Sequence, residues 1–122
     1  MGVWGSGNFD NDAAADYLDG LLGQMFEQVE ATAVDEWAMA PDEEAGARMM
    51  CNIELLGLVG RHIRLVPMDA AVVERWKQKY LVVWDGCIDR LQPVPGFKGE
   101  RRKVIVDTFD RLIELCRERE AT

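Results

Sequence analysis

Apolar residues recur at intervals of three and four positions along most of this 122-residue chain, and no other feature constrains the fold as strongly. Residues three and four apart share one face of an α-helix, so this spacing predicts amphipathic helices. Segments that contain proline and glycine interrupt the pattern. We therefore predict an all-α, single-domain bundle of about five helices behind a glycine-rich N-terminal strap at residues 1–9, with helices over residues 10–22, 23–38, 41–60, 69–91 and 100–118.

Glycine, proline and capping residues set the predicted helix boundaries. Gly20 and Gly23 interrupt the first apolar stripe, and glycine weakens a helix interior, so we expect a break between the first two helices. Pro41, followed by three acidic residues, is typical of a first helical turn. Asp69 is expected to cap the fourth helix. The apolar residues predicted to form the buried face of that helix are Val72, Val73, Trp76, Tyr80, Val83, Trp84, Cys87, Ile88 and Leu91. Two prolines and two glycines in residues 92–99 predict the loop before the last helix.

The first eighteen residues combine three glycines with two large aromatic side chains. Trp4 and Phe9 have little reason to lie in a free tail, so we expect the strap to insert them into the helical core. Asp10 is the expected N-cap of the first helix, because its carboxylate can accept a backbone N–H. Asn11 and Asp12 would then occupy the first turn, near the positive end of the helix dipole.

This opening segment resembles the start of the bacterial "domain of unknown function 4259" family, whose members begin Met-Gly-x-Trp-Gly-x-Gly-x-Phe-x-Asn-Asp. A looser similarity lies at Pro67 and Asp69, before the helix that contains Trp76. The resemblance implies a small helical protein and supplies no activity. The residues that carry the motif, which we interpret as structural, are Trp4, Gly5, Gly7, Phe9, Asp10, Asn11 and Asp12.

Charge is distributed unevenly along the chain, whose formal net charge is −8. Residues 1–47 contain eleven acidic residues and no basic one, a net charge of −11, whereas residues 48–122 carry +3. Nucleic acid is not expected as a partner, because such binding depends on lysine and arginine at phosphates. No apolar run approaches the roughly 18 residues of a membrane span, and no basic leader is present, so we expect no membrane contact and a cytoplasmic location.

Basic residues crowd the start of the last predicted helix, where the helix dipole disfavours cations. We expect them to pair with carboxylates from elsewhere, in particular with a few acids near the amino end of the chain. The basic residues in question are Lys98, Arg101, Arg102 and Lys103.

The three cysteines, Cys51, Cys87 and Cys116, form no Cys-x-x-Cys pair, and their odd number argues against a disulfide framework. We interpret them as reduced, buried thiols. Ser6 and His62 are the only serine and histidine, and Ser6 is not in a nucleophile elbow, so no catalytic triad is predicted.

No metal or cofactor is predicted either. Asp10, Asp12 and Asp16 have carboxylate spacing that is reminiscent of a calcium loop. The glycine and glutamate that such a loop requires are replaced by Ala15 and Leu21, so we assign the three acids to helix capping.

Trp37 is the aromatic residue that we expect to be exposed, because acidic residues and a proline boundary flank it. Exposed aromatics among charges are typical anchors of protein interfaces. The candidate partner-binding patch comprises Asp35, Glu36, Trp37, Asp42, Glu43 and Glu44.

The charge pattern favours a non-enzymatic interaction module, for example an acidic immunity-type or accessory protein that covers a basic protein partner. Two alternatives stay open. One is an enzyme or small-ligand carrier with a carboxylate-lined pocket inside the bundle. The other is a homo-oligomer whose charge asymmetry is neutralised within or between its subunits.

Overall fold

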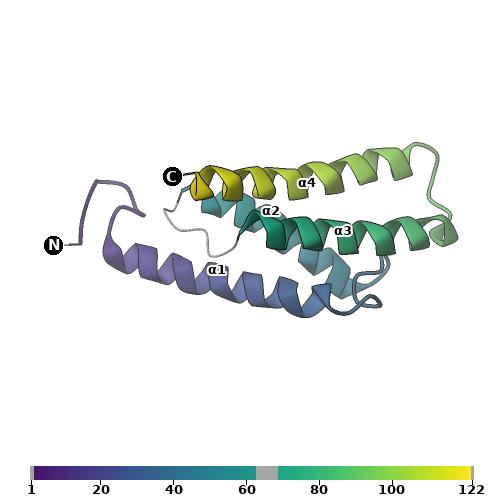
Figure 1. Ribbon diagram of the computed structural model, residues 1–122, viewed down its shortest axis with the longest axis horizontal. Coiled ribbons are helices and arrows are strands. Elements are labelled where there is room, and N and C mark those ends of the chain that lie inside the picture. The colour runs from purple at the N-terminus through teal and green to yellow at the C-terminus, as the bar shows by residue number, and fades with distance from the viewer. Residues whose placement is uncertain (1, 63–68, 122) are drawn as a thin grey trace.

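The computed structural model describes residues 2–62 and 69–121, and in these residues every regular element is a helix (Figure 1). The elements are α1 (Asp12–Ala33), α2 (Glu44–Gly60), α3 (Ala70–Cys87), the 3₁₀-helix η1 (Ile88–Leu91) and α4 (Phe97–Glu120). The predicted all-α bundle is confirmed. The predicted number of helices is wrong, since the described segments form four α-helices.

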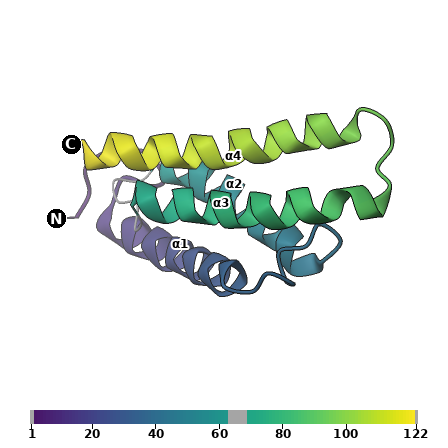
Figure 2. The ribbon, with the colours of Figure 1, turned by 45° about the vertical axis from the view of Figure 1, so that its right-hand side comes forward.

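Helix α4 is the centre of the packing. It packs on both α2 and α3, and α2 also packs on α1, whereas α1 and α3 share a much smaller contact (Figure 2). Helices α3 and α4 run side by side and are joined at one end of the molecule (Figure 1). The helices are thus arranged in the order α1–α2–α4–α3, with a weak closing contact between α1 and α3.

Three aromatic side chains of α3, spaced four residues apart, contribute to the core. Trp76, Tyr80 and Trp84 are each at most 3% exposed, which confirms the buried face predicted for this helix. Tyr80 packs against Phe109 of α4 with ring centroids 5.9 Å apart, and Trp76 packs against Phe26 of α1 at 5.3 Å. The run from Tyr80 to Trp84 is helical as predicted, despite its strand propensity.

Helix α1 passes through Gly20 and Gly23 without a break, so the predicted division at residue 22 is wrong. Glycine costs a helix about 1 kcal/mol per residue relative to alanine. Leu22 and Val29 are at most 1% exposed and lie on either side of Gly23 in the chain. Burial of one such side chain contributes about 1.5–3 kcal/mol, which exceeds the cost of either glycine.

The N-cap of α1 is Asn11, one residue later than predicted. The Asn11 side-chain oxygen accepts from the Ala14 N–H at 2.8 Å. The Asp10 carboxylate instead accepts from the Gly7 N–H at 2.9 Å and closes the preceding turn. Asp10 therefore organises the strap rather than the helix.

The strap does not insert its aromatic residues into the core, which contradicts the sequence prediction. Trp4 and Phe9 are 44% and 46% exposed. The strap folds back on itself, because the Trp4 N–H donates to the Asp10 carbonyl at 2.9 Å, and it extends beyond the helices at one end of the bundle (Figure 1). A Cβ at Gly5 or Gly7 would lie within 2.7 Å of the Asp10 carboxylate, so a side chain at either position would displace this carboxylate from the turn.

Helix α2 begins at Glu44, three residues after the predicted start at Pro41. Residues 35–43 form turns instead. The Asp35 carboxylate accepts from the N–H groups of Trp37 at 3.1 Å and Ala38 at 3.3 Å. Because a side chain satisfies these backbone donors, the segment can form a turn in place of a helix.

Helix α3 begins as predicted and ends earlier than predicted. The Asp69 carboxylate accepts from the Val72 N–H at 2.9 Å, which confirms Asp69 as the N-cap. The α-helix ends at Cys87, and the chain continues to Leu91 as η1. Pro67 lies outside the described residues.

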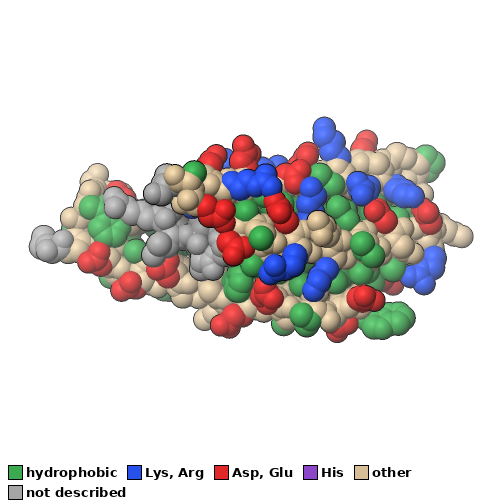
Figure 3. Space-filling view, in the orientation of Figure 1, with side chains coloured by type: hydrophobic (Ala, Val, Ile, Leu, Met, Phe, Trp, Pro, Cys, Tyr) green, Lys and Arg blue, Asp and Glu red, His purple; other side chains and the backbone are tan. Residues whose placement is uncertain are grey.

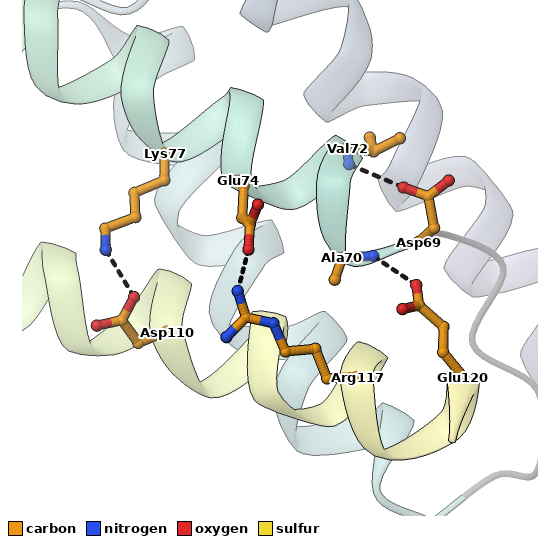
Figure 4. A network of polar contacts seen from close by, with 8 residues as sticks. All are labelled: Asp69, Ala70, Val72, Glu74, Lys77, Asp110, Arg117 and Glu120. Carbon is orange, nitrogen blue, oxygen red and sulfur yellow. Dashed lines mark hydrogen bonds and ion pairs between the residues drawn. The ribbon is translucent and has the colours of Figure 1, made fainter. Parts of the chain in front are cut away.

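Polar contacts align α3 with α4 (Figure 4). Lys77 pairs with Asp110 at 2.7 Å, and Glu74 pairs with Arg117. Glu120, in the last turn of α4, accepts from the N–H of Ala70 at 2.8 Å and so supplements the cap of α3. These contacts fix the register between the two helices.

Two of the basic residues at the start of α4, Lys98 and Arg102, pair with acids of η1 and α3, and not with acids near the amino end as predicted. Lys98 pairs with Asp89 at 2.8 Å, and Arg102 pairs with Asp85 at 3.0 Å. The hydrogen bond from Arg102 lowers the pKa of the Asp85 carboxyl below its usual value.

The three thiols differ in exposure, so the prediction that all are buried holds for Cys116 alone. Cys51 is exposed and Cys87 is half-buried. Cys116 is 1% exposed, and its burial, together with the nearby carboxylates of Glu120 and Asp69, raises its pKa to about 11.

We expect the thiols to react with an aromatic disulfide reagent at neutral pH in the order Cys51, Cys87, Cys116. Only the thiolate attacks the reagent, and Cys116 is both inaccessible and protonated. Mass spectrometry of labelled peptides should place label on Cys116 only after denaturant is added. Rapid labelling of Cys116 in the folded protein would contradict the described packing.

Candidate docking groove

A groove lies between residues 33–43, from the end of α1 to just before α2, and the C-terminal half of α3 with η1. It consists of two adjoining hollows of about 530 and 350 Å³, which share Glu36, Val82 and Val83. We call it the Trp37 groove. Its lining residues are Ala33, Val34, Glu36, Trp37, Met39, Ala40, Asp42, Glu43, Gln78, Lys79, Val82, Val83, Gly86, Cys87, Arg90 and Leu91.

The α1–α2 turns form one wall of the groove, and they pack against the core and against α2. Met39 is 1% exposed and anchors the turns in the core. Gly46, in the first turn of α2, lies so close that a Cβ there would be 3.0–3.2 Å from the carbonyl oxygens of Ala38, Met39 and Ala40. This wall is therefore packed directly onto α2.

The surface of the groove is strongly apolar for a solvent-facing region. Trp37 is 84% exposed, Val34 75% and Val82 74%, and Leu91 is also exposed. Single exposed apolar residues are normal, but a group of them in one hollow marks an interaction surface. Tryptophan is also enriched among the residues that dominate binding energy.

The structure brings four of the six predicted patch residues into the groove. Glu36, Asp42 and Glu43 lie with Trp37 in its lining and are exposed. The hydrogen bonds and ion pairs between described residues include none from these three carboxylate side chains. Their charge therefore faces the groove and the solvent.

The other two patch residues have local roles at its edge. The Asp35 side chain caps the turn at Trp37, and Glu44 pairs with Arg48 at 3.3 Å across one turn of α2. Both residues are exposed. They add to the negative potential near the groove without lining it.

The sequence prediction missed the opposite wall, which α3 and η1 supply. Val82 is apolar, but its position in the helical repeat places it off the buried face of α3. An apolar residue on the solvent-facing side of a helix was the sequence signal that could have indicated this wall. Leu91 was assigned to the core and is 45% exposed. Arg90 brings a positive charge to the wall, and its guanidinium donates to the Cys87 sulfur at 2.9 Å.

The family-motif residues at the N-terminus lie at the other end of α1 from the groove (Figure 1). Trp4, Asp10 and Asn11 shape the strap and the start of α1. The ring of Phe9 lies 6.4 Å from that of His62, centroid to centroid, and His62 is exposed after the end of α2.

The acidic N-terminal segment is largely left without basic partners. On the face drawn in Figure 3, lysine and arginine gather over α3 and α4, while acidic side chains follow the edge formed by α1. Among ion pairs of described residues, Glu44 with Arg48 is the one that involves an acid of residues 1–47. Glu30 accepts from the Trp76 indole at 3.1 Å instead.

The described part of the interior offers no carboxylate-lined pocket. Its one buried polar residue is Thr108, whose hydroxyl donates to the Val104 carbonyl at 2.6 Å. Every acidic residue within 2–62 and 69–121 is at least partly exposed. In the same ranges, no three histidine, cysteine or acidic side chains are grouped as a metal site would require. No described helix combines the length and apolar character that crossing a membrane demands.

Comparison with known proteins connects the first half of this architecture to a family. Neither curated proteins nor solved structures gave a match. The family model described as Domain of unknown function (DUF4259) matches residues 2–61, which comprise the strap, α1, the wall of the groove that follows α1, and α2. This match over residues 2–61 supports the assignment of the chain to the DUF4259 family.

Proposed function

We propose that this protein is a non-enzymatic interaction module that binds a basic protein partner in the Trp37 groove. The observation that carries the proposal is the 84% exposed Trp37 side chain, which lies with exposed Val82 in a groove lined by three carboxylates that form no ion pair with another described residue. An apolar centre within a charged rim is the usual anatomy of a protein interface. The acidic immunity-type or accessory protein, acting in the bacterial cytoplasm, is the concrete form of this proposal.

The charge of the whole chain supports a basic partner over a second copy of the protein. With a net charge of −8, two copies repel each other, whereas a basic partner is attracted to the acidic segment from a distance. Helix α4 also has few free cations for a neighbouring copy, because Lys98 and Arg102 are paired within the chain.

Charge reversal at Glu36, Asp42 and Glu43 to lysine tests the proposal. We expect a partner that the wild-type chain captures from its native host to be lost by this variant and by Trp37→Ala. The matched control reverses Asp16, Asp19 and Glu27, exposed acids of α1 outside the groove lining, and changes the net charge equally. The control should retain most of the binding.

Salt provides the second part of this measurement with the purified partner. Screening acts over about 8 Å at physiological ionic strength, so the association rate should fall as salt rises. The proposal is wrong if binding changes neither with salt nor with charge reversal of the groove acids. It is also wrong if the α1 control loses as much binding as the groove variant does.

A further inference from the structure

We propose that the occupant of the Trp37 groove is a basic amphipathic α-helix that lies antiparallel to α3. This inference rests on the function proposed above and adds the shape and the direction of the bound segment. It follows from three features of the groove: its length along α3, the nature of its walls and the distribution of charge between its ends.

The length of the groove fits a helix of a few turns. Along α3 and η1 the lining extends from Gln78 to Leu91. At about 1.5 Å per residue this stretch spans about 20 Å, the length of a helix of about 14 residues. Helix α1 ends at Ala33 and only the α1–α2 turns follow, so this side of α3 lacks a full helical neighbour (Figure 2).

The walls favour a helix over an extended peptide. An extended peptide gains affinity mainly by pairing its backbone with the edge of a sheet. In the described residues the groove offers side chains of helices and turns, and no strand edge. Helices bind such surfaces through apolar residues at positions i, i+3, i+4 and i+7, which here would contact Trp37 and Val82.

The charges at the two ends of the groove give the bound helix a direction. Asp42 and Glu43 lie in the hollow that reaches Arg90, while Lys79 lies in the other hollow. The N-terminus of a helix carries a partial positive charge and its C-terminus a partial negative charge. The acidic end therefore favours the N-terminus of the occupant, although Arg90 offsets one of the two carboxylates there.

This direction is antiparallel to α3. Helix α3 runs from Lys79 toward Cys87, so an occupant with its N-terminus near Asp42 and Glu43 runs the opposite way. Lysine and arginine on the outer face of the occupant would contact the exposed acids of the rim.

Designed peptides provide a defined probe of the full-length protein. The first is a 14-residue peptide with leucines at helical spacing and lysines on the other face. A second has the same composition in scrambled order, and a third carries a central proline that prevents a helix. We expect the first to bind with a gain of helical circular dichroism, and Trp37→Ala to weaken it about tenfold.

Two further readouts locate and orient the peptide. Binding should slow alkylation of Cys87, which lines the groove, and leave the rate at exposed Cys51 unchanged. A spin label at the N-terminus of the peptide should broaden the amide signals of Asp42 and Glu43 more than that of Lys79. A label at its C-terminus should have the opposite effect.

The outcomes separate the inference from the proposed function. The inference is wrong if the proline peptide binds through Trp37 as tightly as the helical one, or if the spin labels broaden the amide signals in the reverse order. The proposal that the groove binds a basic partner is then unaffected. If none of the peptides depends on Trp37 or protects Cys87, both proposals are wrong. A wild-type dimer that Trp37→Ala dissociates would assign the groove to a second copy and overturn both.

Discussion

Trp84→Ala should lower the free energy of unfolding by about 3–5 kcal/mol, the usual cost of truncating a large buried aromatic side chain. Trp84 is 1% exposed and is among the largest fully buried side chains of the core. Its removal forfeits the burial of the indole and leaves a cavity that the surrounding helices fill only partly. Urea denaturation followed by far-ultraviolet circular dichroism measures the loss.

Trp37→Ala is the matched control for this prediction. The same side chain is removed, but Trp37 is 84% exposed, so we expect the free energy of unfolding to change by no more than about 0.5 kcal/mol. A comparable loss in both variants would show that Trp37 belongs to the core, and would remove it from the proposed docking surface.

Gly46→Ala should lower the free energy of unfolding by about 1–2 kcal/mol, although alanine is the better helix former. The added methyl group would lie 3.0–3.2 Å from three backbone carbonyl oxygens, which cannot move aside as a flexible side chain can. Overpacking of this kind costs about 1–3 kcal/mol. The gain in helix propensity offsets part of that cost.

Gly57→Ala, in the same helix, is the control and should have the opposite effect. A Cβ at Gly57 meets nothing within 4 Å, so only the helix propensity changes. We expect a gain of about 0.5–1 kcal/mol in thermal or urea denaturation. Equal effects at Gly46 and Gly57 would contradict the close packing of α2 on the α1–α2 turns.

The periodicity of apolar residues was sufficient to predict the class of the fold and much of its core. It identified the face of α3 that carries Trp76, Tyr80 and Trp84, and the chemistry of Asp69 identified where that helix begins. These features depend on residues close together in the chain, which is why one sequence specifies them.

Errors arose where the local signals compete with contacts from elsewhere. Gly20 suggested a break, but burial of Leu22 and its neighbours keeps α1 continuous. Trp4 and Phe9 suggested insertion into the core, because hydrophobicity alone does not distinguish a side chain that reaches the core from one held outside it. The Asp10 turn, which depends on the glycines around it, holds both residues at the surface.

The candidate site was predictable on one side only. Trp37 and the acids beside it are adjacent in sequence, so composition was enough to group them. Val82 and Leu91 are more than forty residues from Trp37 in the chain, and only the packing of α3 beside the α1–α2 turns brings them to the same groove. A single sequence contains no direct record of that juxtaposition.

The weak contact between α1 and α3 has a consequence for local opening of the molecule. Helix α1 packs on α2 and, toward α3, contacts Trp76 through Phe26 and Glu30, so we expect it to detach before α2, α4 and α3 separate. Such opening would also remove the wall of the groove that follows α1. A partner that binds only the closed form would suppress this opening and slow amide hydrogen exchange along α1. Exchange in α1 would then report whether the groove, which lies beyond the C-terminal end of this helix, is occupied.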